Sequence, residues 1–353
     1  MKKILFLLNF LFVTSLYGTQ YFVSVSGAKI DIWDITKEDG QEHVITLEGH
    51  KTSVEKVVFD PADENILASI SSDRTVRIWK TESGNWLDAI CIQALCANKG
   101  RGRSLVFSND GKHLAFDVGN NTIRIVETKL WKQIKEINKL PNWVSPGIAF
   151  HPYDSNIIVF VSASSEKNEV HIMNIQSRQV LKILKADFNK LKSVHISADG
   201  NYIASRAFNN MICIWDAKGG ELVGEIGKPS WDIVTTMFGF HLCSDFIIYN
   251  YSTTKSYRAE DELRIVNWKK NWGRNYETKI GGFGYRGERS DEKDIRSASY
   301  NPRFFTHFAI GYGSGFIKIW EVKRESKKFI VKKNKVLKKR AGDVRALAFG
   351  SNL

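Results

Sequence analysis

The residues that most often carry chemistry are scattered along this chain of 353 residues. Its eight histidines are spread through the chain, with no HExxH or GxSxG motif and no recurring pair of closely spaced carboxylates. Cys91, Cys96, Cys213 and Cys243 lack the CxxC spacing and paired histidines of a zinc site. Cys91 and Cys96 are the local candidates for a disulfide, whereas Cys213 lies in an apolar strand pattern. The sequence therefore predicts neither an enzyme nor a metal site.

One glycine motif could suggest nucleotide binding. Gly282 to Gly287 reads GFGYRG and matches G-x-G-x-x-G. That motif binds a pyrophosphate when a strand precedes it and the N-terminus of a helix follows it. Here Glu288 to Glu292 follows, inside an array of strand patterns without a βαβ unit. We interpret the segment as a flexible connection, and we expect no cofactor.

Positive charge is concentrated near the C-terminus. The formal net charge is +13, and Lys323 to Arg340 contains ten basic residues against the single acid Glu325. Such a stretch could bind an anionic polymer, either nucleic acid or acidic glycan, through counterion release. The alternative, which we favour, is an outer strand at Phe329–Val331 and a connection at 332–340, with lysines that prevent pairing with foreign strands. The residues concerned are Lys327, Lys328, Lys332, Lys333, Lys335, Lys338, Lys339 and Arg340.

A four-residue pattern that recurs seven times predicts the elements that position these residues. Successive copies are 46, 47, 47, 42, 51 and 54 residues apart, and each alternates apolar with polar or small residues as a β-strand does. A period slightly above forty residues predicts an array of small sheets that bury their faces against one another. The copies begin at Ile30, Val76, Ile123, Val170, Ile212, Leu263 and Ile317.

Each copy has further strand patterns around it. In the clearest repeat these are Val54–Phe59, a second run from Ile66, a third from Thr75 to Lys80 and a fourth from Trp86 to Ile92. Four strands joined by tight turns form one antiparallel blade. An aromatic residue ends the first strand in six of the seven repeats, and Ile196 replaces it in the other. The aromatic residues are Phe59, Phe107, Phe150, Phe240, Tyr300 and Phe349.

These repeats resemble the WD-repeat family of β-propellers. The resemblance rests on Gly49-His50, on Asp73 six residues before Trp79, and on the Trp-Asp pairs at 33–34 and 215–216. It covers residues 20 to 353 and implies an all-β, seven-bladed propeller with four antiparallel strands per blade. It also implies a buried structural tetrad of His50, Ser69 or Ser71, Asp73 and Trp79. Other repeats depart from this pattern, with Asn120, Asn209 and Ser314 in place of Asp and Val126, Met173 and Val266 in place of Trp.

The two ends of the chain supply complementary parts of one blade. Asp343 to Phe349 has the pattern of a first strand with no blade after it, and Tyr21 to Gly27 has that of a second strand with no first strand before it. We therefore expect the last blade to be shared between the termini, because pairing the two ends removes exposed sheet edges. This gives a single propeller domain over residues 19–353, which we expect to be monomeric.

The family resemblance also implies which face binds partners. In WD-repeat propellers, the second-to-third and fourth-to-first strand connections lie on the same face, where partners usually bind. Long connections at Ser252–Glu262 and Gly281–Asp294 and the basic connection near Lys332–Arg340 fall there. Trp143 and Trp231 are either partner anchors or residues that pack between blades. The predicted partner-binding residues are Trp143, Trp231, Tyr257, Arg258, Phe283, Tyr285 and Arg286.

The N-terminus has the features of a secretory signal peptide. Lys2 and Lys3 precede the apolar run Ile4–Val13, and a small residue follows at Gly18. The run is too short to span a bilayer stably. Residues 1–18 are therefore predicted to be removed on export to the periplasm or outside the cell. If this N-terminus is not the natural one, the alternatives are a buried strand and a cytoplasmic location.

Together these patterns predict an exported, non-enzymatic propeller that holds protein partners on one face of its loops. The first alternative is a protein that binds anionic polymers through Lys323–Arg340. A propeller enzyme with residues lining its central channel is a third hypothesis, for which we find no positive signal. Salt dependence separates the first two, because phosphate binding weakens steeply with salt. The sequence does not identify the partner.

Overall fold

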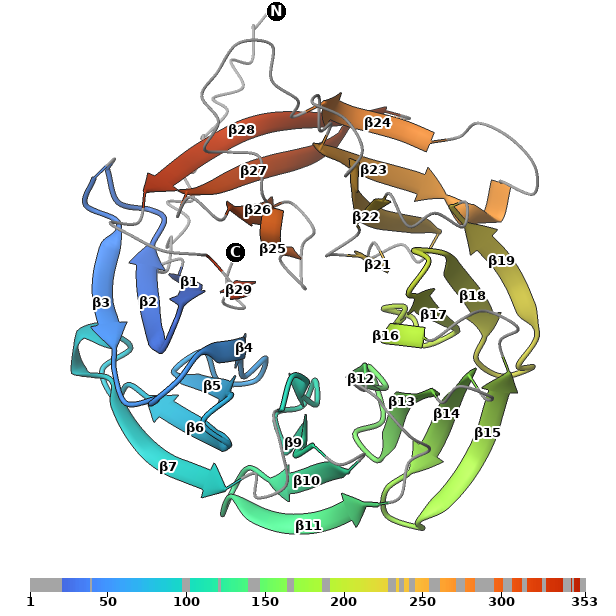
Figure 1. Ribbon diagram of the computed structural model, residues 1–353, viewed down its shortest axis with the longest axis horizontal. Coiled ribbons are helices and arrows are strands. Elements are labelled where there is room, and N and C mark those ends of the chain that lie inside the picture. Colours follow the sequence, from blue (N-terminus) through green and yellow to red (C-terminus); the bar gives the residue numbers. More distant parts are fainter. Residues whose placement is uncertain are drawn as a thin grey trace, which may run out of the picture.

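The strands of this protein form a ring of small antiparallel sheets (Figure 1). A computed structural model describes residues 21–38, 40–96, 102–119, 122–138, 147–163, 168–185, 191–227, 233–234, 238–240, 245–253, 261–270, 277–282, 295–300, 307–312, 316–325, 328–338, 344 and 346–349. Within these residues the strands form seven sheets, each a blade. The chain is an all-β propeller, as the sequence predicts.

Each blade follows the chain from an inner first strand to an outer fourth strand (Figure 1). Blade one contains β4 (Val54–Phe59), β5 (Ile66–Ser71), β6 (Thr75–Lys80), η1 (Trp86–Asp88) and β7 (Ile90–Cys96). Blade two contains β8 (Leu105–Phe107), β9 (His113–Asp117), β10 (Ile123–Glu127) and β11 (Lys132–Ile137). Blade three contains β12 (Ile148–Phe150), β13 (Ile157–Ala163), β14 (Asn168–Asn174) and β15 (Gln179–Lys185).

The other four blades complete the ring. Blade four contains β16 (Leu191–Ile196), β17 (Tyr202–Ala207), β18 (Ile212–Asp216) and β19 (Leu222–Ile226). Blade five contains β20 (Ile233–Val234), β21 (Phe238–Phe240), β22 (Phe246–Thr253), β23 (Asp261–Asn267), η2 (Trp268–Lys270) and β24 (Glu277–Gly282). Blade six contains β25 (Ile295–Tyr300), β26 (His307–Tyr312), β27 (Phe316–Glu325) and β28 (Lys328–Lys338). Blade seven contains β29 (Ala346–Phe349), β1 (Tyr21–Ser26), β2 (Lys29–Asp34) and β3 (His43–Leu47).

The repeated four-residue pattern lies in the third strand of every blade. In β6, Val76 and Ile78 are fully buried, while Arg77 between them is partly exposed. The register between the third and fourth strands shifts beside Trp79, and it shifts beside the corresponding Trp33, Trp215 and Trp320. This local bulge twists the outer strand relative to the third strand.

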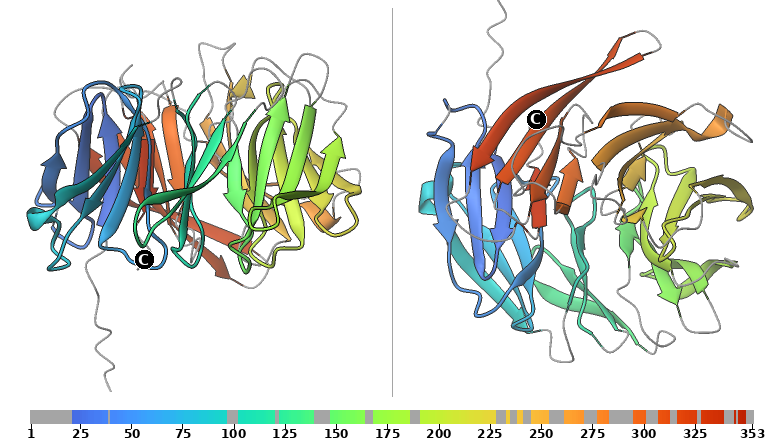
Figure 2. Two further views of the ribbon diagram at one scale, coloured as in Figure 1. Left: turned by 90° about the horizontal axis from the view of Figure 1, so that it is seen from below. Right: turned by 45° about the horizontal axis from the view of Figure 1, so that its top comes forward.

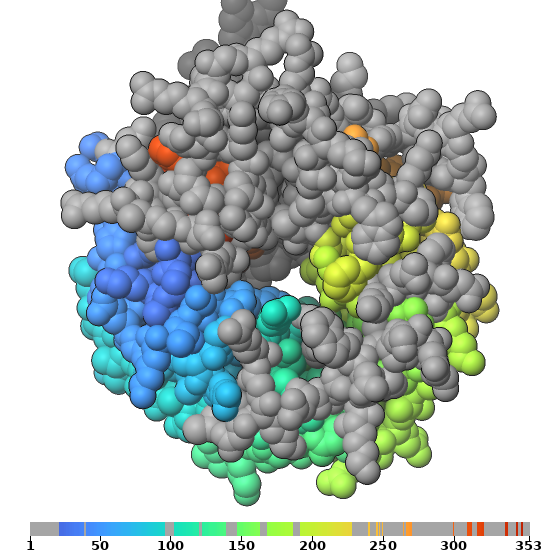
Figure 3. Space-filling model, viewed as in Figure 1, coloured from blue at the N-terminus to red at the C-terminus, as the bar shows by residue number. Residues whose placement is uncertain are grey.

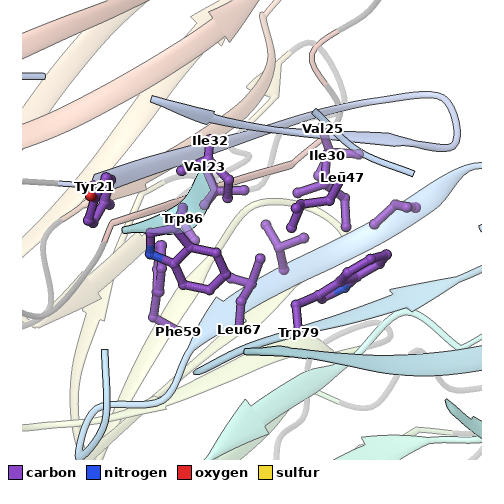
Figure 4. Packing of buried hydrophobic residues seen from close by; sticks show 13 residues of the cluster. Tyr21, Val23, Val25, Ile30, Ile32, Leu47, Phe59, Leu67, Trp79 and Trp86 are labelled. Carbon is purple, nitrogen blue, oxygen red and sulfur yellow. The ribbon is translucent and has the colours of Figure 1, made fainter. Parts of the chain in front are cut away.

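The core lies between neighbouring blades rather than at the centre of the ring. Between blades seven and one, Trp86 is fully buried and packs edge-on against Tyr21 and Phe59, with ring centroids 6.4 and 5.7 Å away (Figure 4). The predicted fourth strand from Trp86 to Ile92 was therefore wrong at its start. Trp86 lies in the 3₁₀ turn η1, where the Asn85 side chain accepts a hydrogen bond from the Leu87 N–H, and β7 begins at Ile90. This turn directs the indole into the core between the blades.

The two ends of the chain meet in blade seven. β29 pairs with β1 from Phe22↔Phe349 to Val25↔Ala346, so the first strand of this blade comes from the C-terminal end of the chain. β1 then pairs with β2, and β2 pairs with β3. The predicted sharing of the last blade is confirmed. Residues 1–20, which include the predicted signal peptide, lie outside the described part of the chain.

The basic stretch forms a long strand pair in blade six. β27 and β28 pair from Phe316↔Lys338 to Glu325↔Lys328, and they form a ribbon that extends beyond the other strands of the blade (Figure 2). The predicted basic connection at Lys332–Arg340 was therefore wrong over Lys332–Lys338, which belong to β28, the outer strand. Pairing with β27 continues through this segment, from Glu321↔Lys332 to Phe316↔Lys338, although the segment does not alternate apolar and basic residues. Lys327, Lys339 and Arg340 lie outside the described residues.

Helical structure is confined, in the residues that the structure describes, to η1 and η2. Neither turn has the length that a membrane-spanning helix needs, and no described segment meets that requirement.

Candidate functional site

The blade topology defines two faces of the ring. Because neighbouring strands are antiparallel, second-to-third turns and fourth-to-first connections emerge on one face, called face A here. First-to-second and third-to-fourth turns emerge on the opposite face, called face B. Strands cross the thickness of the ring between the two faces (Figure 2).

The predicted partner-binding residues belong to connections outside the described residues. These residues are Trp143, Trp231, Tyr257, Arg258, Phe283, Tyr285 and Arg286. The strands on either side of two of these connections are described. β22 ends at Thr253 and β23 begins at Asp261, so the connection predicted at Ser252–Glu262 is shorter at both ends. β24 ends at Gly282, and the connection predicted from Gly281 runs from 283 to 294. Both connections emerge on face A, and their binding role remains a prediction.

Blade one contains a buried chain of hydrogen bonds through His50, Ser69, Asp73 and Trp79. His50 Nδ1 lies 2.9 Å from Asp73 Oδ2, and His50 Nε2 lies 2.7 Å from Ser69 Oγ. Trp79 Nε1 donates to the same Ser69 oxygen at 2.9 Å. The other serine considered at this position, Ser71, instead donates to the Ser53 carbonyl. The chain therefore links the segment before β4 to β5, to the following turn and to β6.

The charge states along this chain follow from its surroundings. Burial lowers the pKa of His50 and outweighs the opposite effect of Asp73. Burial opposes ionisation of Asp73, but hydrogen bonds from Thr75, Lys51 and His50 outweigh it and bring its pKa to about 2. A neutral His50 therefore donates through Nδ1 to the ionised Asp73 and accepts the Ser69 hydroxyl at Nε2.

This arrangement has the connectivity of a Ser-His-Asp triad, but its serine is inaccessible. Ser69 is fully buried, and its oxygen also accepts a hydrogen bond from Trp79. A nucleophile must reach its substrate, so the geometry favours a structural role that ties strands together. The same Trp-to-Ser bond recurs from Trp33 to Ser24 at 2.8 Å and from Trp215 to Ser205 at 3.0 Å.

The cysteines of blade one do not pair with each other. Cys91 and Cys96 lie on the same strand, five residues apart, which separates them by roughly 16 Å in an extended chain. A disulfide needs Cα atoms within about 7 Å, so the local pairing considered from the sequence was wrong. Cys91 is a free, exposed thiol. Cys213 is buried, and burial raises the pKa of its thiol to about 12, as expected for a small core residue.

The ring is hollowed at its centre (Figure 3), and ionisable groups lie on strands near this channel. Lys56 belongs to β4, the first strand of blade one, and His195 belongs to β16, the first strand of blade four. These two strands lie on different sides of the channel (Figure 1). Burial, together with the charges of Lys56 and Arg206, lowers the pKa of His195 to about 3. The charge of Lys56 in blade one therefore disfavours protonation of His195 in blade four.

A buried carboxylate lies on the blade-two side of Lys56. Asp117 Oδ1 accepts hydrogen bonds from the backbone N–H groups of Arg103 and Ser104, at 2.5 and 2.8 Å. Burial nevertheless raises the pKa of Asp117 to about 6, against the effects of these bonds and of Lys56. Burial lowers the pKa of Lys56, which Asp117 partly offsets. The attraction between Lys56 and Asp117 therefore offsets only part of the cost of burying each charge.

Blade four presents positive charge and an aromatic ring where it reaches face A. Arg206 is buried, and its Nε donates to Ser193 Oγ at 3.5 Å. Lys192 Nζ lies 4.0 Å from the ring centroid of Phe208, a cation–π contact. Phe208 lies in the second-to-third turn and is 40% exposed. This turn therefore combines an accessible apolar surface with nearby cations, and we call Lys192, Ser193, His195, Arg206 and Phe208 the blade-four cluster.

The blade-four cluster was not predicted from the sequence, although alignment of the repeats contains its signal. At the position of His195, the other first strands have Val58, Val106, Ala149, Gly239, Ser299 and Ala348. At the position of Arg206 and Asp117, the corresponding second strands of blades seven, one and three have Val25, Ile70 and Val161. Blade five has the polar Asn250 at this second position. Ionisable residues at positions where most other blades have apolar or small residues indicate a local role beyond packing.

The described residues contain no group of three or more His, Cys, Asp or Glu side chains arranged to hold a metal ion. Buried carboxylates such as Asp60 and Asp117 instead lie among backbone hydrogen-bond donors.

Comparison with known proteins agrees with this architecture. A family profile described as "WD domain, G-beta repeat" matches residues 41–80 and 178–216. The chain is 22% identical over 216 residues to THO complex subunit 3 of Arabidopsis thaliana, covering 59% of this chain and 63% of that protein. It is 25% identical over 252 residues to nuclear distribution protein nudF of Aspergillus niger, covering 67% and 55%. A coronin-like protein of Saccharomyces cerevisiae is 26% identical over 264 residues, covering 69% and 36%.

The matched regions do not extend over the whole of these relatives, because the chain spans between 36% and 63% of their lengths. Among solved structures, Kuenenia stuttgartiensis hydrazine synthase is similar in fold, with a TM-score of 0.62 and 13% sequence identity over 76% of each chain. The repeat matches, the ring of four-stranded blades and the recurrent buried Trp-to-Ser bond are features of WD-repeat β-propellers, to which this chain is similar.

Proposed function

We propose that this protein is a non-enzymatic scaffold that holds a protein partner on face A, beside the blade-four cluster. WD-repeat proteins bind protein partners, and the relatives named above support an interaction role. The observation that carries the more specific proposal is Phe208, which is 40% exposed in a second-to-third turn with Lys192 Nζ 4.0 Å from its ring. An exposed aromatic residue beside cations is suited to anchoring a partner.

The charges indicate the chemistry of the partner segment. Burial and the charge of Arg206 lower the pKa of Lys192, which shows that neighbouring positive charges act on it. A carboxylate placed near Lys192 and Arg206 would reduce their mutual repulsion, while an adjacent apolar side chain could cover Phe208. We therefore propose a partner segment that presents an acidic residue next to an apolar one.

The proposal can be tested by cross-linked recovery of partners from cells that produce the protein. Phe208→Ala should reduce partner recovery at least tenfold, because a buried aromatic anchor contributes roughly 2 kcal/mol or more to binding. Tyr153→Ala is the matched control. Tyr153 is 77% exposed and lies in the first-to-second turn of blade three, on face B. Equal recovery by the wild type and both variants, with unchanged thermal melting, would place the partner site elsewhere.

The long basic ribbon formed by β27 and β28 supports anion binding as a second candidate function. β28 contains five lysines in eleven residues and forms the outer strand of blade six. A surface of this kind would bind nucleic acid or acidic glycan with an affinity that falls steeply as salt rises. Titrating the protein against single-stranded DNA and heparin at 50 and about 300 mM salt distinguishes this function from an aromatic-anchored interface.

We also propose that the protein works outside the cytoplasm. The support is the basic, apolar and small-residue sequence of residues 1–18, followed by the strand that begins at Tyr21. An exported scaffold would meet its partner in the periplasm or outside the cell. N-terminal sequencing of the protein recovered from each cellular fraction tests this location.

A further inference from the structure

Every blade of a propeller ends in an outer strand whose far edge has unpaired backbone groups. Such an edge can recruit a foreign strand unless it is covered, charged or distorted. In this ring the outer strands are β3, β7, β11, β15, β19, β24 and β28. Comparing how these seven edges are protected identifies one that differs from the others.

Three of the outer strands are contacted by the next blade. The turn η1 of blade one packs against β3, where Val44 and Ile45 join the cluster around Trp86. The turn η2 of blade five packs against β19, where Ile226 and Trp268 share a core cluster. β28 of blade six lies against β24 of blade five. These contacts restrict access to β3, β19 and β24.

Of the remaining outer strands, β11, β15 and β28 contain lysines, and β7 does not. β11 contains Lys132 and Lys135, and β28 is rich in lysine. β15 contains Lys185 and also Lys182, whose Nζ donates to the Lys218 and Gly219 carbonyls of blade four. Lysine on an edge strand opposes pairing with another strand, because its charge must remain solvated. These three edges therefore have charged side chains along the strand that protect them.

β7 has no lysine, and only Leu95 near its end joins the core cluster shared with blade two, which includes Trp131. Its sequence, Ile90-Cys91-Ile92-Gln93-Ala94-Leu95-Cys96, contains no charged residue. Ile90 is 56% exposed and Ile92 is 38% exposed. β7 pairs with β6 alone among the described strands, so its outer backbone groups face away from the sheet. An uncharged, apolar edge strand of this length is suited to strand addition.

We propose that β7 pairs with β7 of a second copy of this chain, in an antiparallel arrangement about a two-fold axis. Such an axis pairs the strand with an identical strand, and only the residue at the axis faces its own copy, so an edge strand with charges of one sign would lie close to the same charges of its copy. β7 avoids this repulsion because it carries no charge, even though the whole chain has a net charge of +13. The absence of charge favours a second copy over a partner selected by complementary charges.

The size of the contact sets its strength. One pair of seven-residue strands buries less area than the roughly 1,200 Å² of standard stable interfaces. The dimer should therefore be reversible and depend on concentration. This association uses the outer rim of blade one and leaves the blade-four cluster on face A accessible, so it does not depend on the proposed partner site.

Sedimentation velocity of the purified mature chain tests the proposal. The wild type should shift from monomer towards dimer between about 1 and about 500 µM, a range that covers the weak association expected of a small interface. Ile92→Lys should weaken dimerisation at least tenfold, because it places two ammonium groups near the axis. Ile134→Lys, at a residue 42% exposed on the lysine-bearing strand β11, is the matched control and should dimerise like the wild type.

Hydrogen exchange locates the contact independently of the variants. Backbone amides in Ile90–Leu95 should exchange more slowly at high protein concentration than at low concentration, whereas those in β11 should not change. A wild type that stays monomeric over the whole range overturns the proposal. So does an Ile92→Lys variant that keeps its fold and dimerises as strongly as the wild type. Protection of β7 only after another protein is added would also overturn it, in favour of a strand from a different partner.

Discussion

Replacing Asp117 with asparagine should stabilise the protein above pH 6 and leave its stability nearly unchanged near pH 4. Asparagine has the same shape and keeps an Oδ1 acceptor for the N–H groups of Arg103 and Ser104. The substitution therefore removes mainly the charge. Only 3% of Asp117 is exposed to solvent, so burial disfavours the charge of its carboxylate.

The magnitude follows from the pKa of Asp117, which burial raises from 3.8 to about 6. Each difference of one in pKa between the folded and unfolded states corresponds to about 1.4 kcal/mol, so the ionised form costs about 3 kcal/mol of folding free energy. Between about pH 4 and pH 6 the native state retains a proton that the unfolded state has released. The contribution of Asp117 to the free energy of unfolding is therefore fully present below pH 4. It falls as the pH rises from 4 to 6 and stays reduced above pH 6.

Urea unfolding followed by tryptophan fluorescence at pH 4.5 and pH 7.5 measures this difference. Asp117→Asn should raise the free energy of unfolding at pH 7.5 by up to about 3 kcal/mol and by much less at pH 4.5. Asp110→Asn is the control of opposite sign. Burial opposes ionisation of Asp110, but hydrogen bonds from Ser108 and Lys112 lower its pKa to about 2. Asp110→Asn should therefore destabilise the protein above pH 4.

Equal destabilisation by Asp117→Asn at both pH values would refute the reasoning. It would mean that attraction to Lys56 exceeds the effect of burial on the carboxylate. The single variant Lys56→Met and the double variant with Asp117→Asn separate these contributions. If the attraction dominates, Lys56→Met should lower the free energy of unfolding only in the chain that keeps Asp117, and only at pH values where Asp117 is ionised.

Three further predictions concern the fold and the processing of the chain. Ser69→Ala should reduce stability by about 2–4 kcal/mol, because it leaves buried groups of His50 and Trp79 without their bonds, and Ser205→Ala should have a smaller effect in thermal melts. Deleting residues 343–353 should cause aggregation or loss of cooperative melting, because it removes β29 and exposes the edge of β1; a truncated chain that melts like the intact one would contradict ring closure. N-terminal sequencing should find cleavage near Gly18, and an intact Met1 on the soluble cytoplasmic protein would contradict export.

Much of the fold could be predicted because its pattern is local and repeated. The third strand of each blade alternates buried and partly exposed residues, and turn residues such as Asp73 mark where the strand begins. The boundary at Trp86 was missed because the 3₁₀ turn begins with the apolar residues Trp86 and Leu87, which resemble the start of a strand. The end of β28 was missed because lysines suggest a loop when strand pairing is not considered.

The blade-four cluster was harder to predict because it depends on the ring rather than on one segment. Lys56 and His195 are separated by about 140 residues, and each lies within a short strand whose own sequence does not show which residues face it across the ring. Their electrostatic interaction appears only when the blades close around a channel and bring β4 and β16 to different sides of it (Figure 1). Phe208 is different, since a large aromatic residue in a short turn could have been recognised from the sequence.

The pairing of β29 with β1 also sets the order in which the chain can fold. Phe22 and Phe349 are joined by about 330 residues, and closing so long a loop in an unfolded chain is slow because its ends seldom meet. Blades one to six use strands that follow one another in sequence, so they can form while synthesis continues. As they stack, they bring the two ends together and shorten the search. Blade seven must therefore wait for β29, and β1 keeps an open edge until that strand has been synthesised.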